Sequence, residues 1–313
     1  MTIRIRAAAP AALAVGMALT WTSVAHADAP PAPTPANQAE IAKTEAFLKS
    51  LHPIHGDLAV PGAGATLHLG HGFYFLDAAD ARRVLIEGWG NPPDAVQAVR
   101  GMVFPAGHSP LSDTWGAVVT YQPEGYVPDA DAKTTNYDAL LQRMRKGQEQ
   151  IDAQRAKDNV PQVHLVGWAQ PPIYDPASHA LIWARELKVD GAKVDTLNYD
   201  IRELGRRGVL SLNMVSAMPD LAQVHAAAAD LGAAASFDPG ARYGDYHEGV
   251  DKRAAYGVAG LIAAGAGVAL AQKAGLLALG LLFLKKGLVV VAAAGAGLFA
   301  RLRNRVRRKT PQA

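Results

Sequence analysis

The chain has no cysteine among its 313 residues. This absence excludes disulfide scaffolds, thiol nucleophiles, thiolate metal sites and iron–sulfur clusters. Charged residues are sparse at 19%, and aromatic residues make up only 7%. Half of the residues are nonetheless hydrophobic, which is enough to form a core and excludes a wholly disordered chain. The length accommodates about two ordinary domains.

Acidic residues are missing from both ends of the chain. All 28 of them lie between Asp28 and Asp251. The whole chain has a net charge of +3, but residues 28–253 contain 20 basic against 28 acidic residues, a net charge of −8. An acidic body repels the phosphate backbone, whose binding depends on lysine and arginine. We therefore expect no nucleic-acid partner.

The first 36 residues have the pattern of a secretory leader. Residues 1–27 combine Arg4 and Arg6, an apolar run and a small-residue cleavage pattern at residues 25–27, which predicts a signal peptide. A retained anchor helix is the alternative, but the run is short. Residues 28–36 are rich in proline and alanine and predict an extended linker. An extracytoplasmic domain over residues 37–253 follows.

Residues 254–300 contain no acidic residue and consist of three apolar blocks separated by lysines. No single block reaches the roughly 20 residues that cross a bilayer, so a span must include or adjoin a lysine. We expect a C-terminal α-helical membrane segment here; a buried soluble hairpin is the alternative. The stretch 301–313 carries six cations and is expected in the cytoplasm. The chain is thus predicted to be an inner-membrane protein with a periplasmic body.

The body is predicted to be α+β, with a mainly antiparallel sheet and flanking helices. Helices are expected from residue 37 to 51, 77 to 87, 137 to 151 and 219 to 235, and strands over 66–76, 101–104, 115–121, 181–189, 197–202 and 209–215. Matching apolar faces favours Trp183 opposite Ile201 and Leu187 opposite Leu197. That register places Glu186 opposite Asn198.

A polar row on this hairpin is the best candidate for a binding site. It comprises Glu186, Asn198, Asp200 and Arg202, with Arg206 at the following turn, and it can recognise a carboxylate or a partner loop. The alternative is an ordinary solvated sheet face with cross-strand pairs, or an ion-pair network beneath a helix. Arg185 falls on the apolar side of its strand, so it marks the sheet edge or pairs with a buried acid.

Three further residues are weaker binding candidates. Asp129 and Asp131 can hold a divalent cation or a basic partner, although acids ahead of a helix are commonly caps. Trp168 can line a ligand groove or fill the core.

Two His-x-x-His pairs, His52 with His55 and His68 with His71, offer four imidazoles. A proline interrupts the first pair, and the second lies in an expected strand, where positions three apart point to opposite faces. We therefore expect neither a metal site nor a cofactor. No familiar catalytic motif occurs, so no catalytic residue is assigned.

Several short motifs follow one another in a fixed order. They are Gly125-Tyr126-Val127 with Asp129 and Asp131, Gly167-Trp168-Ala169, Pro172-Ile173-Tyr174-Asp175, Trp183-Ala184, Leu197-Asn198-Tyr199-Asp200-Ile201-Arg202, Leu204-Gly205-Arg206-Arg207-Gly208-Val209-Leu210, and Asp251-Lys252 with Tyr256-Gly257. In these motifs the chain resembles DUF2167, a bacterial family of uncharacterised, membrane-anchored proteins. The resemblance implies an envelope location and a C-terminal membrane segment, but no activity.

Two functions remain open at this point. The first is a membrane-anchored periplasmic interaction or scaffold protein, with the membrane and an envelope protein as partners. The second is a membrane-tethered hydrolase or small-molecule sensor that uses Asn198, Asp200 and Arg202. The sequence leaves open the number of membrane crossings and whether the chain forms a homo-oligomer.

Overall fold

The computed structural model describes residues 35–91, 93–157 and 161–265. The expected signal peptide, most of the linker, the apolar stretch from residue 266 and the basic tail lie outside the described residues. No helix within the described ranges combines the length and the apolar character needed to cross a membrane. The chain divides into two units, Met1–Glu45 and Ala46–Ala313, and helix α1 (Pro35–Lys49) begins in the first.

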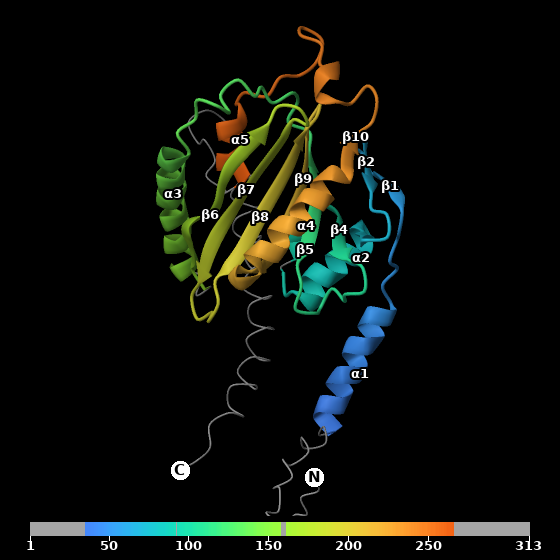
Figure 1. The fold of residues 1–313 in the computed structure, drawn as a ribbon. Coiled ribbons are helices and arrows are strands. Elements are labelled where there is room, and N and C mark those ends of the chain that lie inside the picture. The colour runs from blue at the N-terminus through green and yellow to red at the C-terminus, as the bar shows by residue number, and fades with distance from the viewer. Residues whose placement is uncertain (1–34, 92, 158–160, 266–313) are drawn as a thin grey trace, which may run out of the picture. The chain divides into compact units, whose positions relative to one another are not determined.

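The second unit is built on a seven-stranded antiparallel sheet, which confirms the expected α+β class (Figure 1). In spatial order its strands are β3 (Phe73–Asp77), β4 (Val99–Pro105), β5 (Gly116–Gln122), β9 (Val209–Ala217), β8 (Thr196–Leu204), β7 (Ala180–Val189) and β6 (Val163–Asp175). A second, three-stranded sheet contains β1 (Asp57–Val60), β2 (Ala65–His68) and β10 (Ala235–Phe237).

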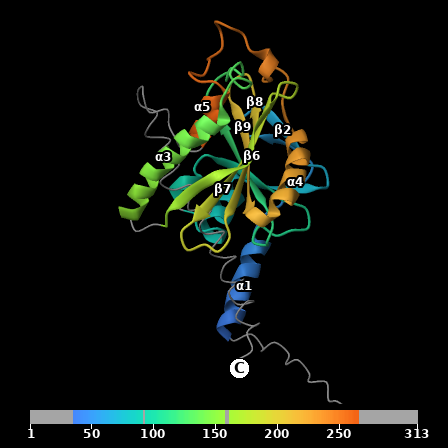
Figure 2. The same cartoon turned by 60° about the vertical axis from the view of Figure 1, so that its left-hand side comes forward.

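Helices cover both faces of the large sheet. They are α2 (Ala78–Arg83), which continues as a π-helical turn (Val84–Gly88), α3 (Tyr137–Lys157), α4 (Leu221–Ala233) and α5 (Val258–Gly265); 3-10 turns occur at Pro93–Val96, Met218–Asp220 and Tyr243–Asp245. Figure 2 shows α3 and α4 on opposite sides of the strands. Strand β8 lies inside the sheet between β9 and β7, and all nine of its residues are buried. The large sheet therefore has no solvated face along this strand.

Alternation along the strands divides the core between the two faces. On the face toward α4, Tyr199 and Ile201 of β8 belong to the same buried cluster as Leu231 of α4. On the face toward α3, Trp183 of β7 shares a cluster with Met144 of α3. Burial of each such large apolar side chain contributes about 1.5 to 3 kcal/mol, so both helices are held by the sheet.

The start of α2 confirms its predicted cap. Asp77 accepts hydrogen bonds from the backbone amides of Ala79 and Asp80, both at 2.9 Å. These bonds satisfy two of the amides that have no partner within the first helical turn. The sequence therefore determines this helix start locally.

The single strand expected over residues 66–76 is wrong. The chain forms β2 and β3 instead, separated by a turn in which Gly70 has φ +54°. That backbone conformation suits glycine and ends the strand. As a result β2 joins the small sheet, whereas β3 forms one edge of the large sheet.

The expected register between the two hairpin strands is wrong by one residue. Trp183 lies opposite Asp200, and Asn198 lies opposite Arg185. Apolar side chains select the register of a strand only where one of its faces meets water. Because β8 is buried on both faces, its apolar residues Leu197 and Tyr199 pack on the α4 side, and Asn198, Asp200 and Arg202 lie on the α3 side.

Candidate functional site

The structure gathers three of the predicted site residues into one buried network on the α3 face of the sheet. Asp200 accepts hydrogen bonds from two guanidinium groups, at 3.1 Å from Arg185 and 2.9 Å from Arg202. Arg185 also donates to the amide oxygen of Asn198. Asn198 and Asn213 exchange two further bonds, at 3.0 and 3.1 Å. The hypothesis that Arg185 pairs with a buried acid is confirmed.

Burial dominates the electrostatics of this network. The Asp200 side chain is 0% exposed, and those of Arg185 and Arg202 are 10% and 7% exposed. Burial lowers the pKa of Arg185; Asp200 counteracts this effect, and Arg202 adds to it. Charges this far from water require direct partners, which explains why one carboxylate lies between two guanidinium groups.

Glu186 does not belong to the network. It lies opposite Leu197, on the α4 side of the sheet. Burial raises the pKa of its carboxyl, and a hydrogen bond with Asp195 adds to the rise. The prediction that Glu186 and Asn198 share a face followed from the incorrect register.

Asp131 caps a helix that is distant in sequence. Its carboxylate accepts hydrogen bonds from the amides of Val258 at 2.9 Å and Ala259 at 3.1 Å, at the start of α5. A Cβ atom on Gly257 would lie 2.4 Å from the carboxylate, so this approach requires glycine. The alternative that this acid is a cap is thus realised, but at α5 instead of the adjacent α3.

Asp129 lies at the rim of the sheet, where the β6–β7 hairpin ends. It accepts a 2.6 Å hydrogen bond from the Tyr174 hydroxyl, which is 2.9 Å from Nδ1 of His179. Burial raises the pKa of Tyr174, and the bond to Asp129 raises it further. His179 has φ +56°, the one positive φ outside glycine in the described part of the chain. An αL residue closes many hairpins, so this conformation follows from the turn.

An aromatic stack extends from this rim. The His179 ring lies 4.2 Å from that of Tyr243, which is 4.5 Å from Tyr126; the Tyr126 ring is 3.9 Å from Tyr246. Offset stacks of this kind add roughly 0.5 to 1.5 kcal/mol per pair beyond burial. Sequence reasoning assigned no role to His179 or Tyr243, because they are brought together only by the turn and the loop after β10.

Arg206 and Trp168 have structural partners. Arg206 Nε donates a 2.8 Å hydrogen bond to Asp251, and this contact raises the pKa of Arg206 and lowers that of Asp251. The indole nitrogen of Trp168 donates to the backbone oxygen of Tyr137 at 3.3 Å. Trp168 therefore packs beneath α3. The predicted site residues are divided among the sheet network, the rim and the α5 junction.

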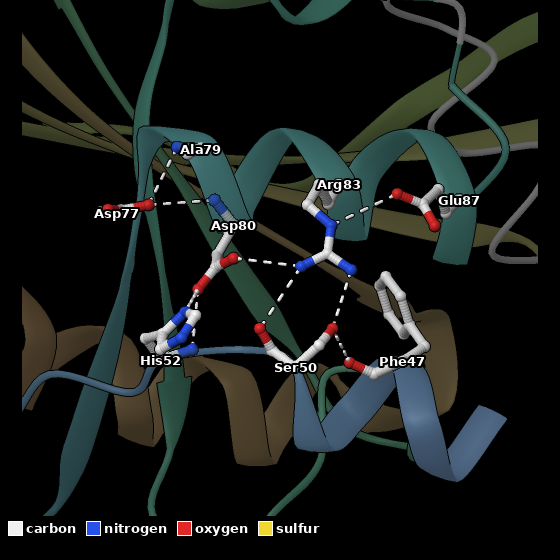
Figure 3. Close-up of polar contacts among 8 residues, drawn as sticks. All are labelled: Phe47, Ser50, His52, Asp77, Ala79, Asp80, Arg83 and Glu87. Atoms are coloured by element: carbon white, nitrogen blue, oxygen red, sulfur yellow. Dashed lines mark hydrogen bonds and ion pairs between the residues drawn. The ribbon is translucent and has the colours of Figure 1, made fainter. Parts of the chain in front are cut away.

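A His–Asp pair with a nearby serine occurs at α2, but it does not form a nucleophilic triad. Figure 3 shows Asp80 between His52, with Nδ1 at 3.1 Å, and Arg83, with Nη1 at 3.4 Å. The Ser50 hydroxyl donates to Phe47 O at 2.7 Å and accepts from Arg83 at 2.8 Å. A triad needs its serine bonded to the histidine. The cluster therefore ties residues 47–52 to α2.

The two His-x-x-His pairs do not converge in the structure. His52 contacts Asp80, whereas His68 lies 3.0 Å from Asp57 in the small sheet. Within the described ranges there is no group of three or more histidine, aspartate or glutamate side chains that could hold a metal ion.

Comparison with known proteins identifies a family but no activity. Residues 52–296 match the family described as "Protein of unknown function (DUF2167)". No curated protein matches the chain. Among solved structures, the solution structure of cyanobacterial PsbP (CyanoP) from Synechocystis sp. PCC 6803 is similar at 10% identity and a TM-score of 0.33, over 58% of this chain and 91% of that chain. Similarity at this level supports no conclusion about fold or function.

Proposed function

This chain belongs to the DUF2167 family, and from that premise we propose that it is a membrane-anchored interaction protein of the bacterial envelope. The body lies in the periplasm and includes the first part of the expected anchor, residues 254–265, which pack in its core; the apolar stretch from residue 266 to 300 reaches the inner membrane, and the basic tail is cytoplasmic. The proposal takes its localisation from the charge and hydropathy of the two ends of the sequence.

The observation that carries the proposal is the junction between the body and the C-terminal segment. Arg206 binds Asp251, the amide of Tyr126 donates to Lys252 O at 2.9 Å, and Asp131 caps α5. Beyond this junction, Leu261 and Ile262 of α5 are buried in the same cluster as Trp183. These contacts hold the start of the C-terminal region, up to the end of α5, against the body. Such an arrangement suits a protein that presents a surface at a defined place near a membrane.

The sheet network gives little support to a hydrolase. A general base must reach the proton that it abstracts, and a nucleophile must reach the reacting atom. Asp200 is fully buried, with one carboxylate oxygen bonded to each of two guanidinium groups. The network therefore fits recognition better than bond cleavage.

The test is site-specific photo-cross-linking of the full-length protein in its membrane. Photoreactive residues replace Ile173 and Val250, which are exposed apolar residues, and exposed Gln97 serves as the control position. We expect one recurrent envelope protein at near-stoichiometric level from Ile173 or Val250 and not from Gln97. Self cross-links alone, or the same products from all three positions, would contradict an interaction protein with a defined partner.

A further inference from the structure

The polar network on the α3 face forms a stripe between two apolar clusters. Trp183 and Leu181 belong to the cluster under α3 and α5, whereas Val215 and Met102 belong to the cluster under α2. Between them run cross-strand rows of polar side chains from four strands. The stripe comprises Arg185, Asn198, Asp200, Arg202, Ser211, Asn213, Thr120 and Gln122.

Exposure rises along the stripe. Asp200 on β8 is completely buried, but Asn213 on β9 and Thr120 and Gln122 on β5 are half-buried. The charged end of the stripe thus lies inside the molecule, and its amide and hydroxyl end is accessible to water. The β5 end of the stripe is therefore the end nearest to solvent.

Hydrogen-bond donors exceed acceptors at the inner end. Both carboxylate oxygens of Asp200 are bonded to guanidinium groups, and the amide oxygen of Gln122 accepts from Arg202 at 3.2 Å. Arg202 Nε and the indole nitrogen of Trp183 are buried and have no hydrogen-bond partner among the described residues. These two residues are neighbours, since the Arg202 guanidinium lies 5.4 Å from the centre of the Trp183 ring. Buried donors without partners each carry a free-energy cost and call for an acceptor.

The adjacent carboxylate does not supply this acceptor. The side chain of Glu124 is hydrogen-bonded to Tyr256. Burial raises the pKa of Tyr256, and the charge of Glu124 and this hydrogen bond raise it further. Within the described residues no ion pair joins Glu124 to Arg202. The donors of Arg202 and Trp183 therefore favour a ligand that only accepts hydrogen bonds.

We infer that the stripe is a binding site for a small oxyanion, the carboxylate or phosphate group of a soluble ligand, recognised by Arg202 with Gln122 and Asn213 at its entrance. Guanidinium binds such groups through charge-assisted hydrogen bonds, and an ionised carboxylate or a phosphate dianion presents mainly acceptor oxygens to it. The site is independent of the membrane anchor and of any protein partner, so its failure would leave the proposed function intact.

The experiment is thermal unfolding of the full-length protein in detergent with inorganic phosphate or acetate, at constant ionic strength maintained with chloride. We expect a saturable rise in Tm of about 3 °C at ten times Kd with one of the two anions. A response to phosphate alone assigns a phosphate ligand, and a response to acetate assigns a carboxylate. No rise with either anion, or an equal rise with chloride, would overturn the inference and leave buried water as the partner of these donors.

Two variants separate recognition from general salt effects. Gln122→Glu places a carboxylate beside Arg202 at the entrance and should abolish the anion-dependent rise in Tm. Gln97→Glu makes the same change at an exposed position and should keep it. If Gln122→Glu impairs folding, Arg202→Lys removes the Nε donor while it keeps the charge, and should weaken anion binding at least tenfold. If Gln122→Glu or Arg202→Lys folds and its Tm still rises with the anion as in the wild type, the stripe is not the anion-binding site.

Discussion

Asp200 shows at the scale of one residue why this sheet tolerates charge in its interior. Its carboxylate is shared by Arg185 and Arg202, and the neighbouring amides of Asn198 and Asn213 continue the network. Removing one member of a buried ion pair leaves the other charge without compensation, which costs more than the pair contributes. The network is therefore sensitive to loss of the acid in particular.

Asp200→Asn should lower the free energy of unfolding by about 3 to 5 kcal/mol, because two buried guanidinium groups lose their counter-charge. Urea unfolding of the variant followed by circular dichroism measures the change. Asp230→Asn makes the same substitution at an exposed position of α4 and should change the stability by less than about 0.5 kcal/mol. Equal effects of the two substitutions would show that Asp200 carries no particular electrostatic role.

Glu203 has a different role at the rim end of β8. Burial raises its pKa to about 8, and Asp175 adds to the rise. An unfolded glutamate has a pKa near 4.3, so between about pH 4.5 and 8 the unfolded state releases a proton that the folded state retains. The contribution of Glu203 to the free energy of unfolding is therefore greatest below about pH 4.5 and falls as the pH rises to 8. By pH 7 this contribution has decreased by ~3 kcal/mol.

Glu203→Gln should remove this decline, because glutamine has nearly the same shape and does not ionise. Urea unfolding at several pH values from 5 to 8 should give a flatter stability curve for the variant and a higher stability than the wild type at pH 8. Glu149→Gln, at an exposed position of α3, is the matched control and should keep the wild-type slope. A parallel decline in wild type and Glu203→Gln would place the titrating group elsewhere.

Residue-scale roles could be predicted only where a local pattern determined them. Arg185 interrupts an apolar row, and that irregularity correctly indicated a buried acid. The residue types of Asn198, Asp200 and Arg202 also indicated a shared site. His179 gave no such signal, because its contacts with Tyr243 depend on a loop that is distant in sequence.

At the scale of elements, α5 is short and depends on its cap. It has eight residues, and Asp131 satisfies two of its first amides from the segment before α3. A short helix has little intrinsic stability, so packing of Leu261 and Ile262 and the cap together maintain it.

Asp131→Ala should lower the free energy of unfolding by about 1 kcal/mol and selectively increase amide hydrogen exchange in residues 258–265. Hydrogen-exchange mass spectrometry of the full-length protein measures the local effect. Asp113→Ala is the control. It removes an exposed loop carboxylate that does not cap α5, and it should leave exchange in α5 unchanged. Unchanged exchange in Asp131→Ala would mean that packing alone holds the helix.

Elements with local signals were predicted correctly, and those fixed by long-range contacts were not. Asp77 begins α2 as expected, because a cap is a contact between near neighbours. The register of β7 and β8 was predicted wrongly, because burial on both faces of β8 removes the apolar–polar contrast that selects it. Gly70 separates β2 from β3 by its conformation, which an alternating pattern of side chains does not reveal.

At the scale of the whole molecule, the described start of the C-terminal apolar region, residues 254–265, packs into the body. The seven-stranded sheet carries helices on both faces, and α5 completes one of them before the apolar stretch that begins at residue 266. Residues up to the end of α5 therefore belong to the packed body.

The absence of cysteine allows this arrangement to be tested directly, since each introduced thiol is unique in the chain. Val250→Cys lies in a loop of the body where the side chain is 80% exposed, and Gln312→Cys lies in the basic tail. In spheroplasts of the bacterial host, a membrane-impermeant maleimide should label Val250→Cys at once. It should label Gln312→Cys only after detergent opens the inner membrane, because the proposed topology places the cationic tail in the cytoplasm. Val224→Cys is fully buried and serves as a control for unfolding during the assay. Immediate labelling of both Val250→Cys and Gln312→Cys would place body and tail on the same side and require an even number of crossings, or none.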